Sequence, residues 1–425
     1  MSSSSRSGAI DDTPALRPVD GLRYGALGLP LAFLAIPLYL QLPSHYAAHE
    51  GVSLPALGLV LLLTRLADAL VDPFIGLAAD RWFSRSSRMA WRIAAASAIA
   101  VAAGFPALFF PPSGVPPLAW LAVMLLLTYL AFSVLVVVHQ AWGVRLGGNT
   151  ARRARVVGWR EGFGLVGVIA ASVLPSVAGM ATSAVVLAVS LAVGLGLLSK
   201  APSPDSPQAA VTHSWLLPWR HAAFRRLLAV FMLNGIASAV PSTLVLFFIR
   251  DRLQLPRAEP LFLSAYFLSA VCSLPLWTRA AGRFGLARTW WAGMLLAIAS
   301  FTWTWLLGAG HLLGFALVCV ASGIALGADL TAPGALLTGV VQRSRQDATA
   351  QGVYVGWWNT ATKLNLGLAA GLALPLLSWA GYTPGRHDNA ALTALGIGYV
   401  LVPCSLKLLA AGLLWRRWLQ PEDTA

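Results

Sequence analysis

The chain has 425 residues, of which 57% are hydrophobic and only 11% are charged, and its mean hydropathy is +0.71. A soluble domain needs far more polar surface than this composition supplies, so the soluble globular classes are excluded. The net charge of +14 is the one feature compatible with a nucleic-acid partner, and the placement of the basic residues argues against that partner below.

The first 23 residues are polar and include Asp11, Asp12 and Asp20. They lack the basic start and the short apolar run of a cleaved signal peptide. We therefore expect a cytoplasmic N-terminal tail over residues 1–23 and a first helix that stays in the mature protein.

Twelve apolar segments follow the tail. A bilayer core about 30 Å thick needs roughly 20 apolar residues for each spanning helix, and each segment is of that order. The pattern predicts an all-α membrane protein with twelve transmembrane helices. The segments cover residues 24–45, 55–79, 92–111, 118–142, 157–178, 181–199, 224–248, 260–279, 289–308, 312–336, 352–379 and 392–415.

A stretch rich in Pro, Ser and Ala, residues 200–223, separates the first six segments from the last six. Such a composition is typical of a linker. We expect an N-terminal six-helix bundle at 24–199, a C-terminal six-helix bundle at 224–415 and a cytoplasmic tail at 416–425. Two such halves in one chain are the layout of a secondary transporter that binds its substrate where the halves meet.

The basic residues predict the orientation. With the N-terminus in the cytoplasm, most of the 30 Lys and Arg residues fall in cytoplasmic segments, and the exceptions outside are Arg250, Arg252, Arg257 and Arg386. This positive-inside bias places both termini in the cytoplasm. The positive charge is then explained by topology, and we expect no nucleic-acid partner.

The second apolar segment carries Arg65, Asp68 and Asp72 near its middle. A spacing of three or four residues places them on one helix face. Lys363, in the eleventh segment, is expected at the same depth and balances the charge of this group. An ionisable group at the bilayer centre costs about 2.5 to 3.5 kcal/mol, so it persists only when paired, hydrated or needed.

Two interpretations of this group stay open. One is a static ion-pair network that holds helices together, although apolar packing replaces such a network at little cost. The other is a coupling site, since two close carboxylates disfavour simultaneous charge and make a proton acceptor or a cation ligand. We take Asp68 and Asp72 as the cation-binding residues, with Arg65 and Lys363 as their charge partners.

Several further positions are candidates for gating or binding or have an expected placement. Gly76, Asp80 and Arg81 form a G-x-x-x-D-R pattern that resembles the helix 2–3 loop signature of the major facilitator superfamily, and a gating role is expected for them. Asp329 lacks an obvious partner in sequence and is a second gating candidate. Tyr39 is expected to line an outer cavity, and Lys407 to extend to the cytoplasmic face.

The stretch "RLADALVDPFIGLAAD" resembles the helix 2 motif of the glycoside–pentoside–hexuronide:cation symporters, the melibiose-permease branch of the major facilitator superfamily. "LRYGALGLP", "HQAWGVRL", "RARVVGWREGFGLVG" and "QGVYVGWWNTATKLNLGLAAGLALPLLSWAGY" resemble other parts of that family in the right order. The resemblance implies the major facilitator fold. It also implies that Asp68 and Asp72 form the cation site, with Lys363 beside it.

The same resemblance implies a substrate pocket. A tryptophan and an arginine near the sugar match Trp142 and Arg160, and polar positions before the helix 11 lysine match Trp358 and Asn359. The sugar-binding acids of the family fall near Ala32 and Val138, so a melibiose-like substrate is in doubt.

The cation is in doubt as well. The amide between the family's two aspartates is Val71 here, and the oxygen ligand expected from helix 4 falls near Leu135. Sodium needs several oxygens, so these departures favour protons.

The sequence contains no G-x-S-x-G, no H-E-x-x-H and no phosphate loop, so we expect no enzyme. The leading hypothesis is a proton- or sodium-coupled symporter of a sugar, glycoside or related small solute, acting by alternating access as a monomer in a bacterial-type inner membrane. The alternatives are an amphipathic cargo such as a lysolipid, proton-driven export, and a non-transporting receptor or scaffold. No cofactor or metal is expected beyond the coupling ion, and the partners are the lipid bilayer and a small-molecule substrate.

Overall fold

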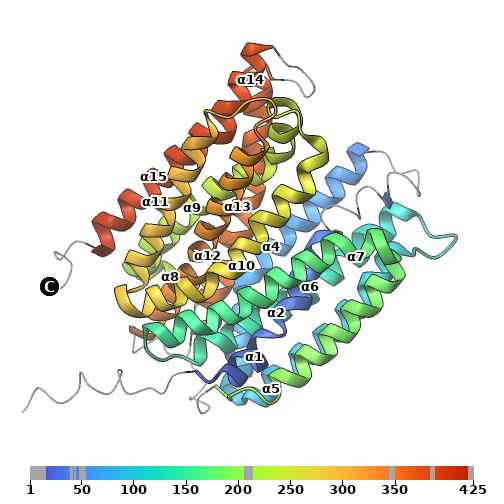
Figure 1. The fold of residues 1–425 in the computed structure, drawn as a ribbon. Helices are drawn as coiled ribbons and strands as arrows, with labels where there is room; N and C mark the ends of the chain where they lie inside the picture. The colour runs from blue at the N-terminus through green and yellow to red at the C-terminus, as the bar shows by residue number, and fades with distance from the viewer. Residues whose placement is uncertain are drawn as a thin grey trace, which may run out of the picture. The chain divides into compact units, whose positions relative to one another are not determined.

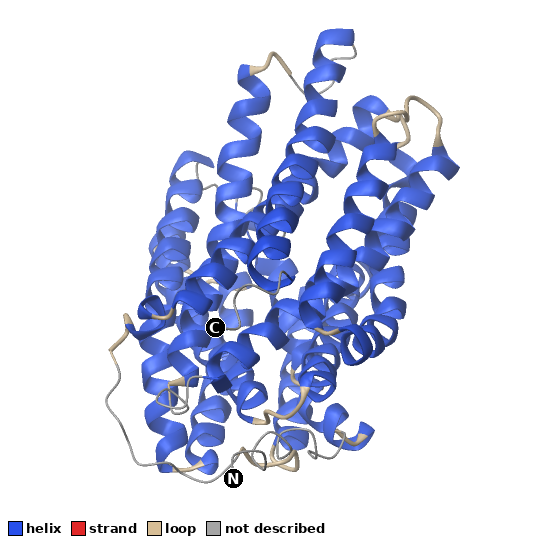
Figure 2. Cartoon of the chain, turned by 90° about the vertical axis from the view of Figure 1, so that its left-hand side faces the viewer, coloured by secondary structure: helices blue, strands red, loops and turns tan. Residues whose placement is uncertain are grey.

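The computed structural model describes residues 16–38, 42, 45–46, 54–204, 214–343, 350–382 and 388–419. Every regular element in this part of the chain is a helix, as Figure 2 shows. The predicted all-α class is therefore confirmed.

The helices follow the order of the predicted segments (Figure 1). The first half of the chain contains α1 (Pro18–Gly25), α2 (Gly28–Ile36), α4 (Leu54–Arg85), α5 (Ser87–Phe109), α6 (Pro117–Arg145), α7 (Thr150–Leu198) and α8 (Leu217–Arg220). The second half contains α9 (Ala222–Phe247), the π-helix η3 (Phe248–Arg252), the 3-10 turn η4 (Pro256–Ala258), α10 (Glu259–Phe284), α11 (Leu286–Thr304), α12 (Leu312–Arg343), α13 (Gln351–Trp379), α14 (Asn389–Gly396), the π-helix η6 (Ile397–Leu401), α15 (Val402–Leu414) and the π-helix η7 (Trp415–Leu419).

Among the described residues, 8 helical stretches are long and apolar enough to cross a membrane. They are Ser87–Phe109, Pro117–Arg145, Thr150–Pro175, Val177–Leu198, Ala222–Arg252, Pro256–Phe284, Leu312–Gln342 and Asn389–Leu419.

The chain forms two compact units. One comprises Met1–Arg220 and Thr338–Thr360, and the other comprises His221–Leu337 and Ala361–Ala425. The long helices α12 and α13 therefore contribute residues to both. The linker expected at 200–223 lies partly outside the described residues, and the boundaries of the two predicted bundles stay a prediction.

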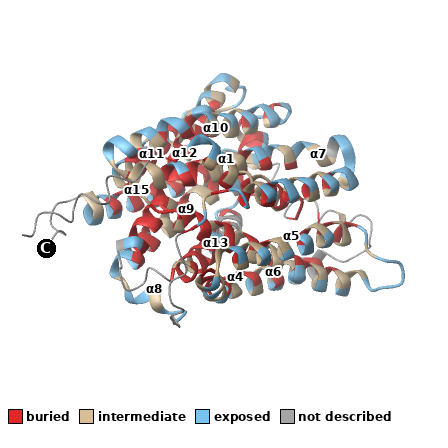
Figure 3. Cartoon of the chain, turned by 90° about the horizontal axis from the view of Figure 1, so that it is seen from below, coloured by how far each residue is buried: buried red, intermediate tan, exposed pale blue. Residues whose placement is uncertain are grey.

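Each helix divides into a buried face and an exposed face, which Figure 3 shows by colour. In α5 the buried residues Ala90, Ala94, Ala98 and Val101 recur every three or four positions, as expected for one face of a helix. Ile99 on the opposite face is 71% exposed. Large apolar side chains on the outer face of a spanning helix suit contact with lipid.

Close backbone contact holds the first helices of the first unit against α7. A Cβ atom on Gly167 would lie 2.1 Å from the carbonyl oxygen of Leu29, and one on Gly25 would lie 2.8 Å from the backbone of Trp159. The packing of α1 and α2 on α7 thus needs residues without a side chain, as is common between membrane helices.

The fifth and sixth predicted segments both lie in α7, which consists of two helices joined by a kink at Gly179. This residue has φ 81° and ψ 170°, a backbone conformation that is essentially restricted to glycine. The break lies between the two predicted spans and marks their junction.

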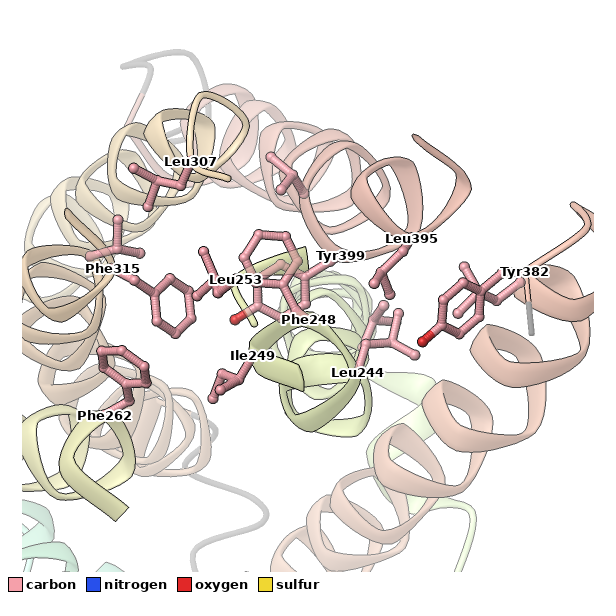
Figure 4. Close-up of a cluster of buried hydrophobic side chains, with 14 of the residues drawn as sticks. Leu244, Phe248, Ile249, Leu253, Phe262, Leu307, Phe315, Tyr382, Leu395 and Tyr399 are labelled. Carbon is pink, nitrogen blue, oxygen red and sulfur yellow. The ribbon is translucent and has the colours of Figure 1, made fainter. Parts of the chain in front are cut away.

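The second unit has an apolar core around the end of α9 and η3 (Figure 4). Phe248 is fully buried and stacks on Tyr399, with ring centroids 4.3 Å apart. At the edge of this core, the Tyr382 hydroxyl in the segment after α13 donates a hydrogen bond to Asp251. Burial, and then this bond to a carboxylate, raise the pKa of Tyr382 above its ordinary value.

We predict that Gly179→Ala lowers the stability of the protein by about 1–3 kcal/mol, because alanine does not readily adopt this backbone conformation. The measurement is the thermal unfolding midpoint of the purified protein in detergent. The matched control is Gly196→Ala in the same helix, where no atom lies within 4 Å of the new Cβ. That substitution should leave stability unchanged or raise it by about 0.5–1 kcal/mol. Equal changes in the thermal unfolding midpoint for the two substitutions would contradict the requirement for glycine at position 179.

Candidate functional site

Asp68 and Asp72 lie on the buried face of α4, one helical turn apart. Their exposed fractions are 4% and 0%, respectively. The hydroxyl of Ser133, on α6, donates a hydrogen bond of 2.5 Å to Oδ1 of Asp68. The site therefore combines two buried carboxylates with a hydroxyl oxygen from a neighbouring helix.

The Ser133 hydroxyl corrects an expectation from the sequence. The oxygen ligand of helix 4 was expected to be missing because Leu135 stands near its place. Ser133, two residues earlier, supplies a hydroxyl in that region. Two departures from the family favoured protons over sodium, and the one on helix 4 no longer does so. The other remains, because the side chain of Val71 has no oxygen.

A proline shapes α4 beside Asp72. Pro73 has no N–H, so the carbonyl of Ala69, four residues earlier, loses its usual helical partner. The Thr360 hydroxyl, on α13, donates a hydrogen bond of 2.9 Å to this oxygen. The freed carbonyl is thereby satisfied by the neighbouring helix, as the membrane interior requires.

The first part of α13 packs on α4 with almost no side chain between them. A Cβ on Gly356 would lie 2.4 Å from the carbonyl oxygen of Asp72, and one on Gly76 would lie 2.2 Å from that of Gly352. Gly76, expected to have a gating role, thus has a close-packing role in the structure. This contact brings the backbone of α13 directly against the turn of α4 that carries Asp72.

Asp80 joins three helices at the end of α4. Its Oδ1 accepts hydrogen bonds of 2.6 Å from Nη2 of Arg145 on α6 and of 2.6 Å from the N–H of Gly352. Its Oδ2 accepts one of 3.0 Å from the N–H of Val353. Asp80 therefore neutralises a buried arginine and also satisfies N–H groups in the first turn of α13.

Arg145, which sequence reasoning did not select, is the ionic partner of Asp80. Its guanidinium also lies 4.2 Å from the centre of the Phe83 ring. The side chain of Arg81 is exposed. A gating role of Asp80 and Arg81 stays a prediction, and the structure adds Arg145 to the residues that any such gate would involve.

The other predicted residues of the cation site fall in different places. Arg65 is half-buried, and its guanidinium lies 5.1 Å from the centre of the Tyr129 ring on α6. Lys363 is also half-buried and belongs to the second unit, whereas Asp68 and Asp72 belong to the first. The pairing of Lys363 with the two aspartates stays a prediction.

The predicted substrate residues of α6 and α7 make local contacts. Trp142 is 3% exposed, and its Nε1 donates a hydrogen bond of 3.1 Å to the carbonyl oxygen of Pro202. Arg160 pairs with the adjacent Glu161, with an Nη2–Oε1 distance of 2.6 Å. These contacts occupy both side chains, and their role in binding stays a prediction.

Two predicted substrate residues lie on α13. Trp358 is 7% exposed and Asn359 is 6% exposed. The buried Nδ2 of Asn359 has no hydrogen-bond partner in the described part of the chain. An unsatisfied buried amide is unusual and marks this position as one that can receive a ligand oxygen. Tyr39 lies outside the described residues.

Asp329, the second gating candidate, has a partner that sequence did not reveal. Its Oδ2 lies 2.8 Å from Nζ of Lys407 on α15. Its Oδ1 accepts hydrogen bonds of 3.0 Å from Asn234 on α9 and of 2.9 Å from Trp290 on α11. The expectation that Lys407 extends to the cytoplasmic face is wrong, because this lysine is only 7% exposed and binds within the unit.

We predict that Lys407→Met destabilises the protein by about 3–5 kcal/mol, because it leaves Asp329 buried without its cation. Adding Asp329→Leu should recover most of that loss, since an apolar pair of similar volume replaces a buried ion pair at little cost. The thermal unfolding midpoints of the single and double variants measure both effects.

The control for this pair is Arg250→Met, which breaks the pair of Arg250 with Glu259 in the same unit. The Arg250 side chain is 56% exposed, so its substitution should change the thermal unfolding midpoint little. A Lys407→Met variant as stable as this control would show that the buried pair does not hold the helices together.

Comparison with known protein families gives a match over most of the chain. The family described as MFS/sugar transport protein matches residues 21–420. Among curated proteins, the sodium-dependent lysophosphatidylcholine symporter 1-A of Danio rerio is 24% identical over 198 residues. This match covers 46% of the present chain and 37% of the relative, so the chain spans well under half the length of that relative.

Solved structures share the fold. A bacterial homologue of the iron transporter ferroportin, in an outward-facing state, has a TM-score of 0.69 at 14% identity, and the match covers 94% of this chain and 99% of that one. The Escherichia coli fucose:proton symporter has a TM-score of 0.62 at 14% identity, with coverage of 92% and 97%. The human organic anion transporter MFSD10 has a TM-score of 0.63 at 15% identity, with coverage of 95% and 100%. At these identities the likeness concerns the fold alone.

Proposed function

This chain belongs to the MFS/sugar transport protein family, and on that premise we propose that it is a cation-coupled transporter with its coupling site at Asp68 and Asp72. Membership of this family makes the chain an integral membrane transporter of the major facilitator fold and not an enzyme. The coupling, the cargo and the direction of transport are the proposal.

The observation that carries the proposal is the pair of carboxylates buried on α4. Asp72 has no exposed surface, and Asp68 accepts a hydrogen bond from the Ser133 hydroxyl. Carboxylate and hydroxyl oxygens are ligands for hard cations, and a pair of close carboxylates also takes up a proton readily. The membrane interior makes such groups costly unless they have a use.

The cation binds on a helix that is in close contact with α13. The Cβ position of Gly356 is 2.4 Å from the carbonyl oxygen of Asp72, and the Thr360 hydroxyl bonds the carbonyl of Ala69. We propose that occupancy of Asp68 and Asp72 changes this contact. Lys363, three residues after Thr360 on α13, would then sense the change, and Arg65 would act with it as a charge partner.

We propose a sugar, glycoside or related small solute as cargo, bound by Trp142, Arg160, Trp358 and Asn359 and carried by alternating access. The free Nδ2 of Asn359 supports a polar group in the cargo. An amphipathic cargo is the alternative, supported by the similarity to a lysophosphatidylcholine symporter and by the absence of acids at Ala32 and Val138. The proposed setting is a bacterial-type inner membrane with both termini in the cytoplasm, and the proposed functional form is a monomer without a cofactor.

The test is uptake into proteoliposomes under an imposed proton or sodium gradient, with labelled sugars, glycosides and lysophosphatidylcholine as probes. We expect one gradient to drive accumulation of one probe class, and Asp72→Asn to abolish that accumulation while the protein still inserts. Asp20→Asn is the control, since Asp20 lies in the first turn of α1 and pairs with Arg23 at 3.6 Å. Full accumulation by the Asp72→Asn variant would rule out the proposed coupling site.

A second substitution tests the oxygen that α6 supplies. If sodium is the coupling ion, Ser133→Ala should raise the sodium concentration for half-maximal uptake about tenfold, because one oxygen ligand and one hydrogen bond to Asp68 are lost. Ser183→Ala is the control, because Ser183 is equally buried but donates to the carbonyl oxygen of Gly179 within its own helix. An unchanged sodium dependence in Ser133→Ala would exclude this hydroxyl from the cation site.

A further inference from the structure

The second unit contains a cavity of about 180 Å³ that the proposed transport site does not use. It lies among α9, α10, α11, α12, η6 and α15. Its walls are mostly apolar and aromatic, with Pro241, Phe262, Phe301 and Phe315 among them. Apolar cavities of about 150 Å³ hold molecules of the size of benzene, so this volume is sufficient for a small ligand.

Two tyrosines bring hydroxyl groups to this apolar space. Tyr399 is only 3% exposed, and its ring is held between Phe248 and Phe301, with centroid distances of 4.3 Å and 5.8 Å. In Figure 4 its hydroxyl lies on the side of the Phe248 stack that faces Phe262 and Phe315. Tyr266 on α10 lines the same cavity.

Neither hydroxyl makes a hydrogen bond to another residue in the described part of the chain, and neither is fully enclosed by protein atoms, so both are open to the cavity. A tyrosine hydroxyl in this position can donate one hydrogen bond to a molecule that enters the cavity. The two tyrosine hydroxyls therefore present hydrogen-bond donors to the cavity.

The two charged residues at the cavity wall, Lys407 and Asp329, neutralise each other and so do not favour a charged ligand. Lys407 uses its ammonium on Asn234 at 2.7 Å, Ser238 at 3.1 Å and Asp329 at 2.8 Å. Asp329 accepts from Asn234, Trp290 and Lys407. The pair is electroneutral and its hydrogen bonds are filled, so burying a charged group beside it would bring no compensation.

Two serine hydroxyls at the wall already donate hydrogen bonds to backbone carbonyls. Ser322 donates to the carbonyl oxygen of Val318 at 2.7 Å, and Ser242 donates to that of Ser238 at 3.0 Å. The two tyrosines and Ser238, which accepts from Lys407, are thus the hydroxyl groups of the lining that donate to no other residue in the described part of the chain.

We propose that this cavity is a binding site for a neutral, mainly apolar molecule with one oxygen that accepts a hydrogen bond from Tyr399. A medium-chain alcohol has this chemistry. The site lies within one unit and stands on the cavity alone, so it does not depend on which cargo or cation the protein transports.

The three cysteines allow a direct test. Cys319 and Cys404 line the cavity, whereas Cys272 is exposed and lies outside its lining. The full-length protein in detergent is treated with methyl methanethiosulfonate, a small neutral thiol reagent, with and without 1-hexanol. Mass spectrometry then follows modification of each cysteine.

We expect 1-hexanol at ten times its Kd to slow modification of Cys319 and Cys404 about tenfold, since mass action leaves about a tenth of the sites empty. Cys272 should react at an unchanged rate, and hexanoate at the same concentration should give no protection. Tyr399→Phe should raise the Kd of 1-hexanol roughly fivefold through the loss of one hydrogen bond, so that the slowing falls to about threefold at the same concentration. Tyr24→Phe, which removes another buried hydroxyl in the first unit, should not change it.

A second measurement covers the case in which the buried thiols react too slowly to follow. Ala297→Leu fills part of the cavity, because Ala297 is a lining residue. The change in thermal midpoint caused by 1-hexanol should be more positive for the wild type than for Ala297→Leu. The proposal would be overturned if 1-hexanol slowed modification of Cys272 as much as that of Cys319 and Cys404, or if hexanoate protected as well as 1-hexanol. It would also be overturned if Tyr399→Phe kept full protection, or if 1-hexanol changed the thermal midpoints of the wild type and Ala297→Leu equally.

Discussion

A charge buried among apolar helices has to find its counter-charge and its hydrogen bonds inside the protein, because no water is present to supply them. Asp80 shows this most clearly. It is 6% exposed and takes one guanidinium and two backbone N–H groups from α6 and α13. One carboxylate thereby fixes where three helices of the first unit meet. Asp68 and Asp72 lie about two to three turns earlier on the same helix, α4.

The same requirement explains the neighbourhood of Asp72. Pro73 frees a carbonyl, Thr360 satisfies it, and Gly356 lets the two backbones approach closely enough for that bond. The proposed cation site is therefore not a pair of side chains on an independent helix. It lies on a segment whose backbone is already bonded to α13, which is the kind of rigid support that a binding site needs.

The two acidic clusters differ in composition. Asp329 is fully engaged by Lys407, Asn234 and Trp290, and such a saturated, neutral group is suited to holding helices together. Asp68 and Asp72 place two carboxylates within one turn, an arrangement suited to taking up a cation. This contrast supports a structural role for the first cluster and a coupling role for the second.

The sequence by itself determined the features that depend on local periodicity. Helix spacing predicted that Asp68 and Asp72 share a face, and hydropathy predicted the order of the spans, which the helices follow. Only the tertiary structure decided the partners. Ser133, Arg145 and Lys407 lie 65, 65 and 78 residues from the carboxylates that they contact, and an oxygen from helix 4 and a buried role for Lys407 were both missed. The reason is that a partner on another helix depends on how that helix is rotated and shifted along its axis, and close packing between helices sets both.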